Sequence, residues 1–574
     1  MGPEGVSRLL AEAGVDARRF REALALLCDG AWWTLADLVR ETATSRRGIE
    51  ALLREIGPQR SGERFRLTAE QAGAYRALLG DGHGVPADPV AHLLPRHADV
   101  VALMEKLIAG GPRGRQALDH VAATPETVVR RALLLGARFW LPGSRLLCVG
   151  DHDLTSLAVA MLSPGVEVTV VDIDERILAH IDDQAERLGL DVRTRWADLR
   201  LGLPPSAREQ ADLAITDPPY TPEGIGLFVA RAVEGLRDPE RGRILLAYGA
   251  SERTPMLALK VQRSLYDLNL AFEAMYPDFN RYIGAEAIGS AADLYVLRPT
   301  TKTRPAVAAR VERFVTAIYT QGPQAVESRP AAPSAAGPRP AGPVPEGWGP
   351  EPPGVTGSGP ERSGSAGSGA GFEPEVLVGE WPKEVLPRAP RARLSTWLAK
   401  PYAASPSRVA MAVPAGLEAA LPRLLLATRA RHVRAFLSGS TPPDLSALRP
   451  LYEITATGAV VDAVRLPPPA DETGRLLRAI LDNAHGRLAN TWREGLIRAR
   501  EGLTKKQART IVSEAAPWSA DVTVLELPAH RLSALREAVV ASLRLAAVSH
   551  ADAHGEPHGE AHGEGGSPSP GQIG

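Results

Sequence analysis

The chain has 574 residues, of which 44% are hydrophobic and 23% charged, a composition typical of folded protein and a length too great for one core. Its 66 basic and 67 acidic side chains give a formal net charge of −1, which counts against a protein that coats nucleic acid. The only cysteines, Cys28 and Cys148, cannot form a disulfide framework or a Cys-X-X-Cys metal pair. No signal-peptide pattern or membrane-length apolar run is present, so we expect a cytoplasmic protein without a membrane partner.

Residues 1–80 show the pattern of a winged-helix domain. Apolar helices are followed by a helix that Thr34 would cap, a turn, a helix that begins near Ser45, and a short β ribbon. Arg46 and Arg47, at the start of the third helix, could contact DNA. Because no further basic cluster accompanies them, we favour a role in packing or dimerisation over nucleic-acid binding, and leave a homodimer open.

Residues 81–120 have the pattern of a helical connector, and residues 121–321 alternate short apolar strands with helices. The strand-like segments are RLLCVG, EVTVVDID, DVRTRWAD, DLAITDPP and GRILLAYG. This alternation predicts an α/β domain with a Rossmann-like, methyltransferase-type parallel sheet covered by helices on both faces.

The remainder of the chain divides into three parts. Residues 322–373 are rich in Pro, Gly and Ser and predict a disordered linker. Residues 374–548 predict an additional folded domain of unknown role, with helical patterns over 417–437 and 473–500. The tail, 549–574, carries evenly spaced histidines, and we favour disorder over metal binding there; they are His550, His554, His558 and His562.

Acidic residues follow successive predicted strands of the α/β domain. In an open parallel sheet, ligands bind beyond the carboxyl ends of the strands. Asp172 lies about 20 residues past the first turn, where an acid accepts hydrogen bonds from ribose hydroxyls. Each residue alone could cap a helix or lie in a turn, but together they favour one shared site. The strand-end residues are Gly150-Asp151-His152-Asp153, Asp172 with Asp174, Asp198, and Asp217-Pro218-Pro219-Tyr220.

The first strand-to-helix turn lacks the Gly-X-Gly-X-X-Gly pattern that binds a pyrophosphate. Its two aspartates would repel phosphate and attract a cation. A ligand with adenine, ribose and a positive charge fits this turn, which favours adenosyl sulfonium compounds and disfavours NAD.

Several runs in this domain resemble the branched-chain polyamine synthase, or bis(aminopropyl)spermidine synthase, family: ATPETVVRR (residues 123–131), LLCVGDHDLTSLAVAM, VVDIDERIL, ADLR, TDPPYTPEG, YPDFNRY and SAADLYVLRP. The resemblance extends from the winged-helix block to about residue 300. It implies an enzyme, an aminopropyltransferase that moves the aminopropyl group of decarboxylated S-adenosylmethionine to a polyamine nitrogen and releases methylthioadenosine.

The resemblance also implies roles for individual residues. Gly150, Asp151 and Asp153 match the family's Gly-Asp-Asp-Asp turn, in which His152 replaces the middle aspartate. We expect Asp151 or Asp153 to be the base, assisted by Asp217. The expected donor-binding residues are Gly150, Asp172, Asp174, Asp198 and Pro218; the expected acceptor-binding residues are His152, Pro219, Tyr220 and Asp278; no metal is expected. The histidine suggests a less cationic acceptor or a different donor.

Two alternatives remain open. A strand that ends in Asp-Pro-Pro-Tyr is typical of S-adenosylmethionine-dependent methyltransferases that act on exocyclic amino groups, with Tyr220 stacked on a flipped base. The second alternative is a regulator that senses a nucleoside or polyamine without turnover. The paired aspartates at the first turn favour aminopropyl transfer, and the scarcity of lysine beside abundant arginine and alanine suggests a GC-rich bacterial source.

Overall fold

The computed structural model describes residues 3–13, 17–79, 88–250, 254–311, 317–321, 324–326, 372–439 and 441–554. They belong to two compact units, Met1–Leu466 with Leu525–Leu532, and Pro467–Val524 with Ser533–Gly574. Apart from 324–326 and 372–373, the expected linker lies outside the described residues, as do His558 and His562 of the expected tail. Within the described ranges no helix is both long and apolar enough to cross a membrane.

The N-terminal elements of the first unit form a small helical domain with a three-stranded antiparallel sheet of order β1-β3-β2. Thr34 caps α3 in a capping box with Asp37, and Ser45 caps α4. The elements are α1 (Pro3–Ala13), α2 (Ala17–Leu27), β1 (Trp33–Thr34), α3 (Leu35–Thr42), α4 (Arg46–Ile56), β2 (Gln59–Ser61), β3 (Arg64–Arg66) and α5 (Ala69–Tyr75).

Short helices lead from this domain to the main sheet: η2 (Arg76–Leu78), η3 (Ala91–His97), α6 (Ala98–Ala109), η4 (Gln116–Leu118) and α7 (Pro125–Arg138). Thr124 caps α7, and Pro125 occupies its first turn, where the missing N–H is not needed. The buried face of α7 contains Val128 and Leu135 and, between them, the charged side chain of Arg131.

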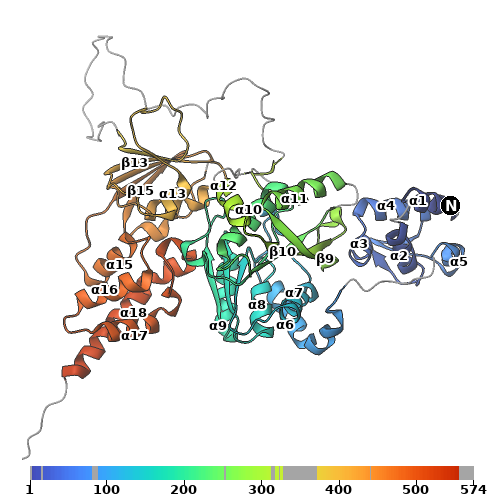
Figure 1. The fold of residues 1–574 in the computed structure, drawn as a ribbon, viewed down its shortest axis with the longest axis horizontal. Coiled ribbons are helices and arrows are strands. Elements are labelled where there is room, and N and C mark those ends of the chain that lie inside the picture. Colours follow the sequence, from blue (N-terminus) through green and yellow to red (C-terminus); the bar gives the residue numbers. More distant parts are fainter. Residues whose placement is uncertain are drawn as a thin grey trace, which may run out of the picture. The chain divides into compact units, whose positions relative to one another are not determined.

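The main sheet has seven strands in the order β6-β5-β4-β7-β8-β10-β9. Figure 1 shows the neighbouring strands β10 and β9 of this sheet. The first five are parallel, which confirms the α/β prediction. The prediction did not include the last two, which are antiparallel because residues 282–290 are too few for a crossover helix. The strands are β4 (Arg145–Val149), β5 (Glu167–Asp172), β6 (Val192–Trp196), β7 (Leu213–Thr216), β8 (Arg243–Tyr248), β9 (Leu270–Arg281) and β10 (Ala291–Pro299).

Helices pack on this sheet in two groups. Along the chain, α6 contacts α7, α7 contacts α8, and α8 contacts α9, whereas α10 contacts α11 and α12. The buried apolar residues of the strands and of α10 form one core. This packing brings the carboxyl ends of β4, β5, β6 and β7 to one edge of the sheet. The helices are α8 (Thr155–Leu162), α9 (Glu175–Leu188), η5 (Pro205–Ala207), α10 (Pro222–Gly235), α11 (Pro255–Asp267), η6 (Glu286–Ile288) and α12 (Thr303–Val311).

A second sheet, of order β12-β11-β13-β14-β16-β15, follows in the same unit. Four strands are parallel and β16 runs antiparallel to β14, as β10 does to β8. Part of the helix expected over 417–437 is therefore strand β14, whose alternate residues are buried. The elements are β11 (Val376–Val378), β12 (Arg391–Ala392), α13 (Leu394–Ala399), β13 (Arg408–Val413), η8 (Glu418–Ala420), α14 (Leu421–Leu426), β14 (His432–Leu437), η9 (Ser446–Leu448), β15 (Tyr452–Thr457) and β16 (Val460–Arg465).

The second unit is helical. Its core contains Trp492, which is buried and donates a hydrogen bond to Ser542. The helix expected over 473–500 is broken between α15 and α16, and the block expected over 374–548 is divided between the two units. The elements at this end of the chain are α15 (Glu472–Asp482), α16 (Leu488–Ala499), α17 (Lys505–Ala515), η10 (Pro517–Ser519), η11 (Val524–Glu526) and α18 (Ala529–His554), which continues past the start of the expected tail.

Candidate active site

A cavity of about 430 Å³ opens at the carboxyl ends of β4, β5, β6 and β7. Residues from 116–121, 282–288 and 318–321 complete its wall. Ten of the residues singled out from the sequence line it: Gly150, Asp151, His152, Asp153, Asp172, Asp198, Asp217, Pro218, Pro219 and Tyr220. The strand ends therefore do come together around one cavity.

The first turn joins β4 to α8. Gly150 has a φ of 75°, in the left-handed region that a side chain would disfavour, and this lets the chain turn sharply. The two carboxylate oxygens of Asp151 accept hydrogen bonds from the backbone N–H groups of Thr155 and Ser156, at 2.8 and 3.1 Å. Burial raises the pKa of Asp151 to about 7. Asp151 therefore anchors the N-terminus of α8 and changes its protonation state near neutral pH.

A buried arginine, Arg131, joins the carboxylates of two cavity residues, Asp153 and Asp217. Arg131, whose side chain is only 2% exposed, donates hydrogen bonds to Asp153 at 2.9 Å and to Asp217 at 2.5 Å. Its Nε donates to Asn280 at 2.8 Å. Burial raises the pKa of Asp153, and Arg131 opposes that rise. Asp153 and Asp217 thus share one positive charge.

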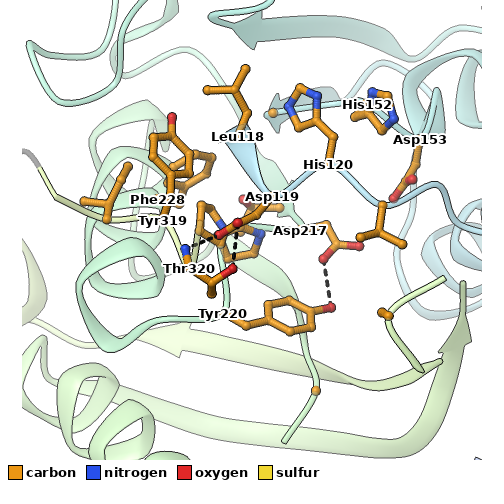
Figure 2. A pocket seen from close by; sticks show the side chains of 18 of the residues that line it. Leu118, Asp119, His120, His152, Asp153, Asp217, Tyr220, Phe228, Tyr319 and Thr320 are labelled. Carbon is orange, nitrogen blue, oxygen red and sulfur yellow. Dashed lines mark hydrogen bonds between the residues drawn. The ribbon is translucent and has the colours of Figure 1, made fainter. Parts of the chain in front are cut away.

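Asp217 also accepts hydrogen bonds from two tyrosines. The Tyr220 hydroxyl donates to Oδ1 at 3.0 Å (Figure 2), and the Tyr282 hydroxyl donates to Oδ2 at 2.7 Å. Burial raises the pKa of both hydroxyls well above the ordinary tyrosine value, which keeps them protonated. The Asp217 side chain is nevertheless 19% exposed, against 6% for Asp153, so it is the more accessible of the two to a ligand.

The opposite end of the cavity contains Asp172 and Asp198. Asp172 accepts hydrogen bonds from the N–H groups of Asp174 and Asp151, at 2.8 and 3.0 Å, and burial raises its pKa. Asp198 is held by Arg200 through two hydrogen bonds of 2.8 and 2.7 Å. Arg200 also donates to the carbonyl oxygen of Gly416 at 2.7 Å. The acid expected beside adenine is therefore already paired with a cation.

Two of the expected site residues do not line this cavity. Asp174 caps α9 and forms an ion pair with Arg176 at 2.6 Å, so its carboxylate is committed to the helix N-terminus. Asp278 lies on β9 and forms an ion pair with Arg19 of α2 at 2.9 Å. It lines a separate depression, so the structure does not bring it to the cavity with the other expected residues.

No individual role was expected for Arg131, Tyr282 or Asp119. Arg131 had a usable signal, since it occupies an apolar-face position three residues after Val128 and four before Leu135. The other contacts join distant segments and had none. The carboxylate of Asp119, for example, accepts hydrogen bonds of 2.6 and 2.7 Å from the N–H and hydroxyl of Thr320, which ties 116–121 to 318–321 (Figure 2).

Residues 99–318 match the family model of the branched-chain polyamine synthase A C-terminal domain. The match covers less than half of the 574 residues. We refer to 99–318 as the family domain. It contains all the strand ends that line the cavity, and it excludes the second sheet and the second unit.

Curated relatives agree with this match. An uncharacterized protein of Methanocaldococcus jannaschii is 39% identical over 174 residues, 30% of this chain and 43% of that protein. The N(4)-bis(aminopropyl)spermidine synthase of the same organism is 26% identical over 275 residues, 45% of this chain and 75% of that protein. The N(4)-bis(aminopropyl)spermidine synthase of Thermococcus kodakarensis is 32% identical over 166 residues, 29% of this chain and 45% of that protein. The chain thus spans less than half the length of the first of these relatives.

Outside the family domain, Arg46 was expected as a candidate DNA contact. Its guanidinium is bonded to Glu50 at 3.0 Å and to Glu286, which lies in η6 beside the cavity wall. Among the described residues, no group of three or more His, Cys, Asp or Glu side chains is arranged to hold a metal ion.

Proposed function

We propose that this chain is an aminopropyltransferase that moves the aminopropyl group of decarboxylated S-adenosylmethionine to an amine nitrogen of a polyamine and releases methylthioadenosine. One observation carries the proposal: a single cavity in the family domain is lined by carboxylates from four successive strand ends. Carboxylates suit a donor and an acceptor that are both cationic. The names of the relatives from M. jannaschii and T. kodakarensis support the same reaction.

The donor end would use residues at the tips of β4, β5 and β6. Asp172 has its carboxylate fixed by two backbone N–H groups, which orients it toward a ribose diol. The backbone of Gly150 lies between the ring edge of Phe228 and the carboxylate of Asp172. A Cβ added at Gly150 would be 3.4 Å from Phe228 and would occupy space that the glycine leaves open to the donor. Asp198, held by Arg200, would accept a hydrogen bond from the adenine amino group.

The transfer itself needs little activation because the carbon beside a sulfonium is already electrophilic. The amine lone pair attacks this carbon, the carbon–sulfur bond breaks, and its electrons leave with the sulfur of neutral methylthioadenosine. The new ammonium then loses a proton to a carboxylate. Holding amine and donor in line is therefore the main task of the protein.

Three carboxylates are available for the proton, and we assign it to Asp217, with Asp153 and Asp151 as supporting groups. Asp217 is the more exposed of the two that Arg131 joins, and its hydrogen bonds from Tyr220 and Tyr282 fix its direction. The oxygens of Asp151 are directed to the N-terminus of α8.

Mass spectrometry of the products tests the proposal. The full chain is incubated with decarboxylated S-adenosylmethionine and either spermidine or a shorter diamine, and in parallel with ordinary S-adenosylmethionine. Methylthioadenosine together with an amine one aminopropyl group heavier is the expected result. S-adenosylhomocysteine formed with a nucleic-acid or small-molecule acceptor, and no methylthioadenosine with any amine, would overturn it.

The Asp217-Pro218-Pro219-Tyr220 run gives a second candidate, a methyltransferase for an exocyclic amino group, because all four residues line the cavity. In that reaction Tyr220 would stack on the target base. Its hydroxyl is instead bonded to Asp217 and lies 2.8 Å from that of Tyr282. A D153N variant separates both enzymes from a sensor, since a catalyst would lose turnover and a sensor only ligand affinity.

A further inference from the structure

The second sheet lies outside the family domain, yet a loop of it contacts the donor end of the cavity. This loop, 414–417, connects β13 to η8 and contains Gly416, whose φ of 82° lies in the left-handed region. The Gly416 carbonyl accepts a hydrogen bond of 2.7 Å from Nη2 of Arg200. The 414–417 loop therefore meets the cavity at the side chain that holds Asp198.

A single nitrogen of Arg200 is bonded to both sides of this contact. Nη2 donates one hydrogen bond to Oδ2 of Asp198 and another to the Gly416 carbonyl, each at 2.7 Å. Because a guanidinium is planar and the directions of its N–H groups are fixed, two acceptors on one nitrogen determine how the plane is turned. Nε then donates to Oδ1 of Asp198 at 2.8 Å. The position of the Gly416 carbonyl thus constrains the direction from which Arg200 holds the carboxylate.

The charges around Arg200 keep it protonated. Its side chain is 4% exposed, and burial alone would lower its pKa, but Asp198, and then Tyr319 and Glu418, outweigh burial and raise it. Glu418 is the residue directly after the 414–417 loop. Arg200 is therefore a permanent cation, and the loop acts on it by fixing its orientation.

The 414–417 loop also holds a second part of the cavity wall. Nε2 of Gln324 donates a hydrogen bond of 2.5 Å to the Ala415 carbonyl. The N–H of Tyr319 donates to the Gln324 carbonyl at 3.2 Å, and the N–H of Val326 donates to the Tyr319 carbonyl at 2.9 Å. Tyr319 lines the cavity in an apolar cluster with Phe228 (Figure 2). The loop is therefore bonded to two neighbouring parts of the donor end.

A separate contact fixes the second sheet at this edge of the cavity. Arg423 of α14 is buried and donates a hydrogen bond of 2.6 Å to Glu175, the first residue of α9. Its guanidinium lies over the ring of Trp196, 4.1 Å from the centroid. Trp196 ends β6, two residues before Asp198. The second sheet is thus held against the segments on both sides of Asp198.

We propose that the 414–417 loop is a positioning element of the donor site: it fixes Arg200, and Arg200 fixes Asp198, in the arrangement that binds the nucleoside of the donor. This role rests on the proposed function and extends the donor site beyond the family domain. Displacement of the loop should weaken nucleoside binding and leave the acceptor end, at Asp153 and Asp217, unaffected.

The test uses the full chain as wild type, G416A and G458A. A Cβ at position 416 would lie 2.4 Å from Cγ of Gln324, so the loop or the side chain that holds it must move. Gly458, in the turn between β15 and β16 of the same sheet, is the matched control. Its φ is 59° and an added Cβ would have nothing within 4 Å, so G458A takes on similar backbone strain away from the cavity.

Calorimetry gives the Kd for methylthioadenosine, and initial rates give KM for decarboxylated S-adenosylmethionine and for the amine. In G416A we expect both donor constants to rise about fivefold, because a hydrogen bond to a charged group is weakened. KM for the amine in G416A, and the Kd in G458A, should stay within about twofold of the wild type. A variant that only folds less well would bind with a lower stoichiometry and an unchanged Kd.

An unchanged Kd in G416A would overturn the proposal, as would an equal rise in G458A. If G416A does not fold, as judged by its thermal transition, Q324A removes the hydrogen bond to Ala415 without adding backbone strain. Q324A should raise the Kd in the same direction, and an unchanged Kd there would equally overturn the proposal. Failure of the proposed function is distinguishable, because the wild type itself would then release no methylthioadenosine with any amine, and the positioning role would fall with it.

Discussion

Arg131 on α7 donates a hydrogen bond of 2.5 Å to Asp217, which follows strand β7 86 residues later in the chain. The same guanidinium holds Asp153 after β4 at 2.9 Å. A helix that precedes the sheet thereby fixes the ends of two adjacent strands. Arg131 is buried, and its removal would leave Asp153, whose side chain is 6% exposed, without a countercharge.

The first prediction concerns this ion cluster. An R131M variant keeps most of the side-chain volume but leaves the buried Asp153 and the partly exposed Asp217 without a countercharge. We expect the free energy of unfolding of the family domain, measured by urea denaturation, to fall by about 3–5 kcal/mol. R138M, which breaks the more exposed pair of Arg138 with Glu273, is the control and should cost about 1 kcal/mol or less. Equal losses in the two variants would contradict the interpretation.

The second prediction concerns the proton acceptor. A D217N variant retains the shape of the side chain but cannot take a proton, and its single amide oxygen can accept from only one of the oxygens' present partners, Tyr220 on Oδ1 or Tyr282 on Oδ2. We expect kcat for methylthioadenosine release to fall about 10²–10⁴-fold. The affinity for methylthioadenosine, measured by calorimetry, should change little, because Asp217 lies at the acceptor end. D183N, on the exposed face of α9, serves as the control and should retain full activity. A D217N enzyme with wild-type kcat would move the role to Asp153.

The third prediction follows from the raised pKa of Asp151, about 7 in the folded protein against roughly 4 for a free carboxyl. Between these values the folded state binds a proton that the unfolded state has released, so Asp151 lowers stability as pH rises from about 4 to about 7. A D151N variant has no such titration. The melting temperature of D151N minus that of the wild type should therefore be larger at pH 8 than at pH 5. A difference that stays constant or falls between pH 5 and pH 8 would show that the pKa of Asp151 is not raised in the folded protein.

The sequence predicted the positions of the strand ends well because they depend on local signals. An apolar run followed by an acid identified β4, β5, β6 and β7, and ten expected site residues line one cavity. The two exceptions are Asp174 and Asp278, which do not line the cavity. Asp174 forms an ion pair with Arg176 and Asp278 with Arg19, and the sequence pattern around these acids does not reveal those partners.

What the sequence did not predict depends on contacts between distant segments. The antiparallel β9–β10 hairpin and the second sheet have no periodicity that separates them from a helix of similar composition, as strand β14 illustrates. The cancellation of charge by Arg131 and Arg200 was also missed, because the pattern gives the acids and not their partners. The cavity is therefore less anionic than its aspartates alone suggest.

The last prediction tests that point at the donor end. Arg200 is almost fully buried, holds Asp198 through two hydrogen bonds from its guanidinium, and donates a further hydrogen bond to the Gly416 carbonyl in the loop after β13. In an R200A variant Asp198 keeps the hydrogen bond from the backbone N–H of residue 200 but loses those from the guanidinium, and with them the orientation needed to meet the adenine amino group.

We expect the Kd for methylthioadenosine, measured by calorimetry, to rise about tenfold, a loss of about 1.4 kcal/mol. The relative kcat/KM for diamine and triamine should not change, because the acceptor end is untouched. R208A is the control, since the Nε of Arg208 donates a hydrogen bond to the Leu203 carbonyl and Arg208 does not line the cavity. An unchanged Kd in R200A would mean that Asp198 does not contact the nucleoside, and the adenine would then have to be held by the apolar wall of the cavity alone.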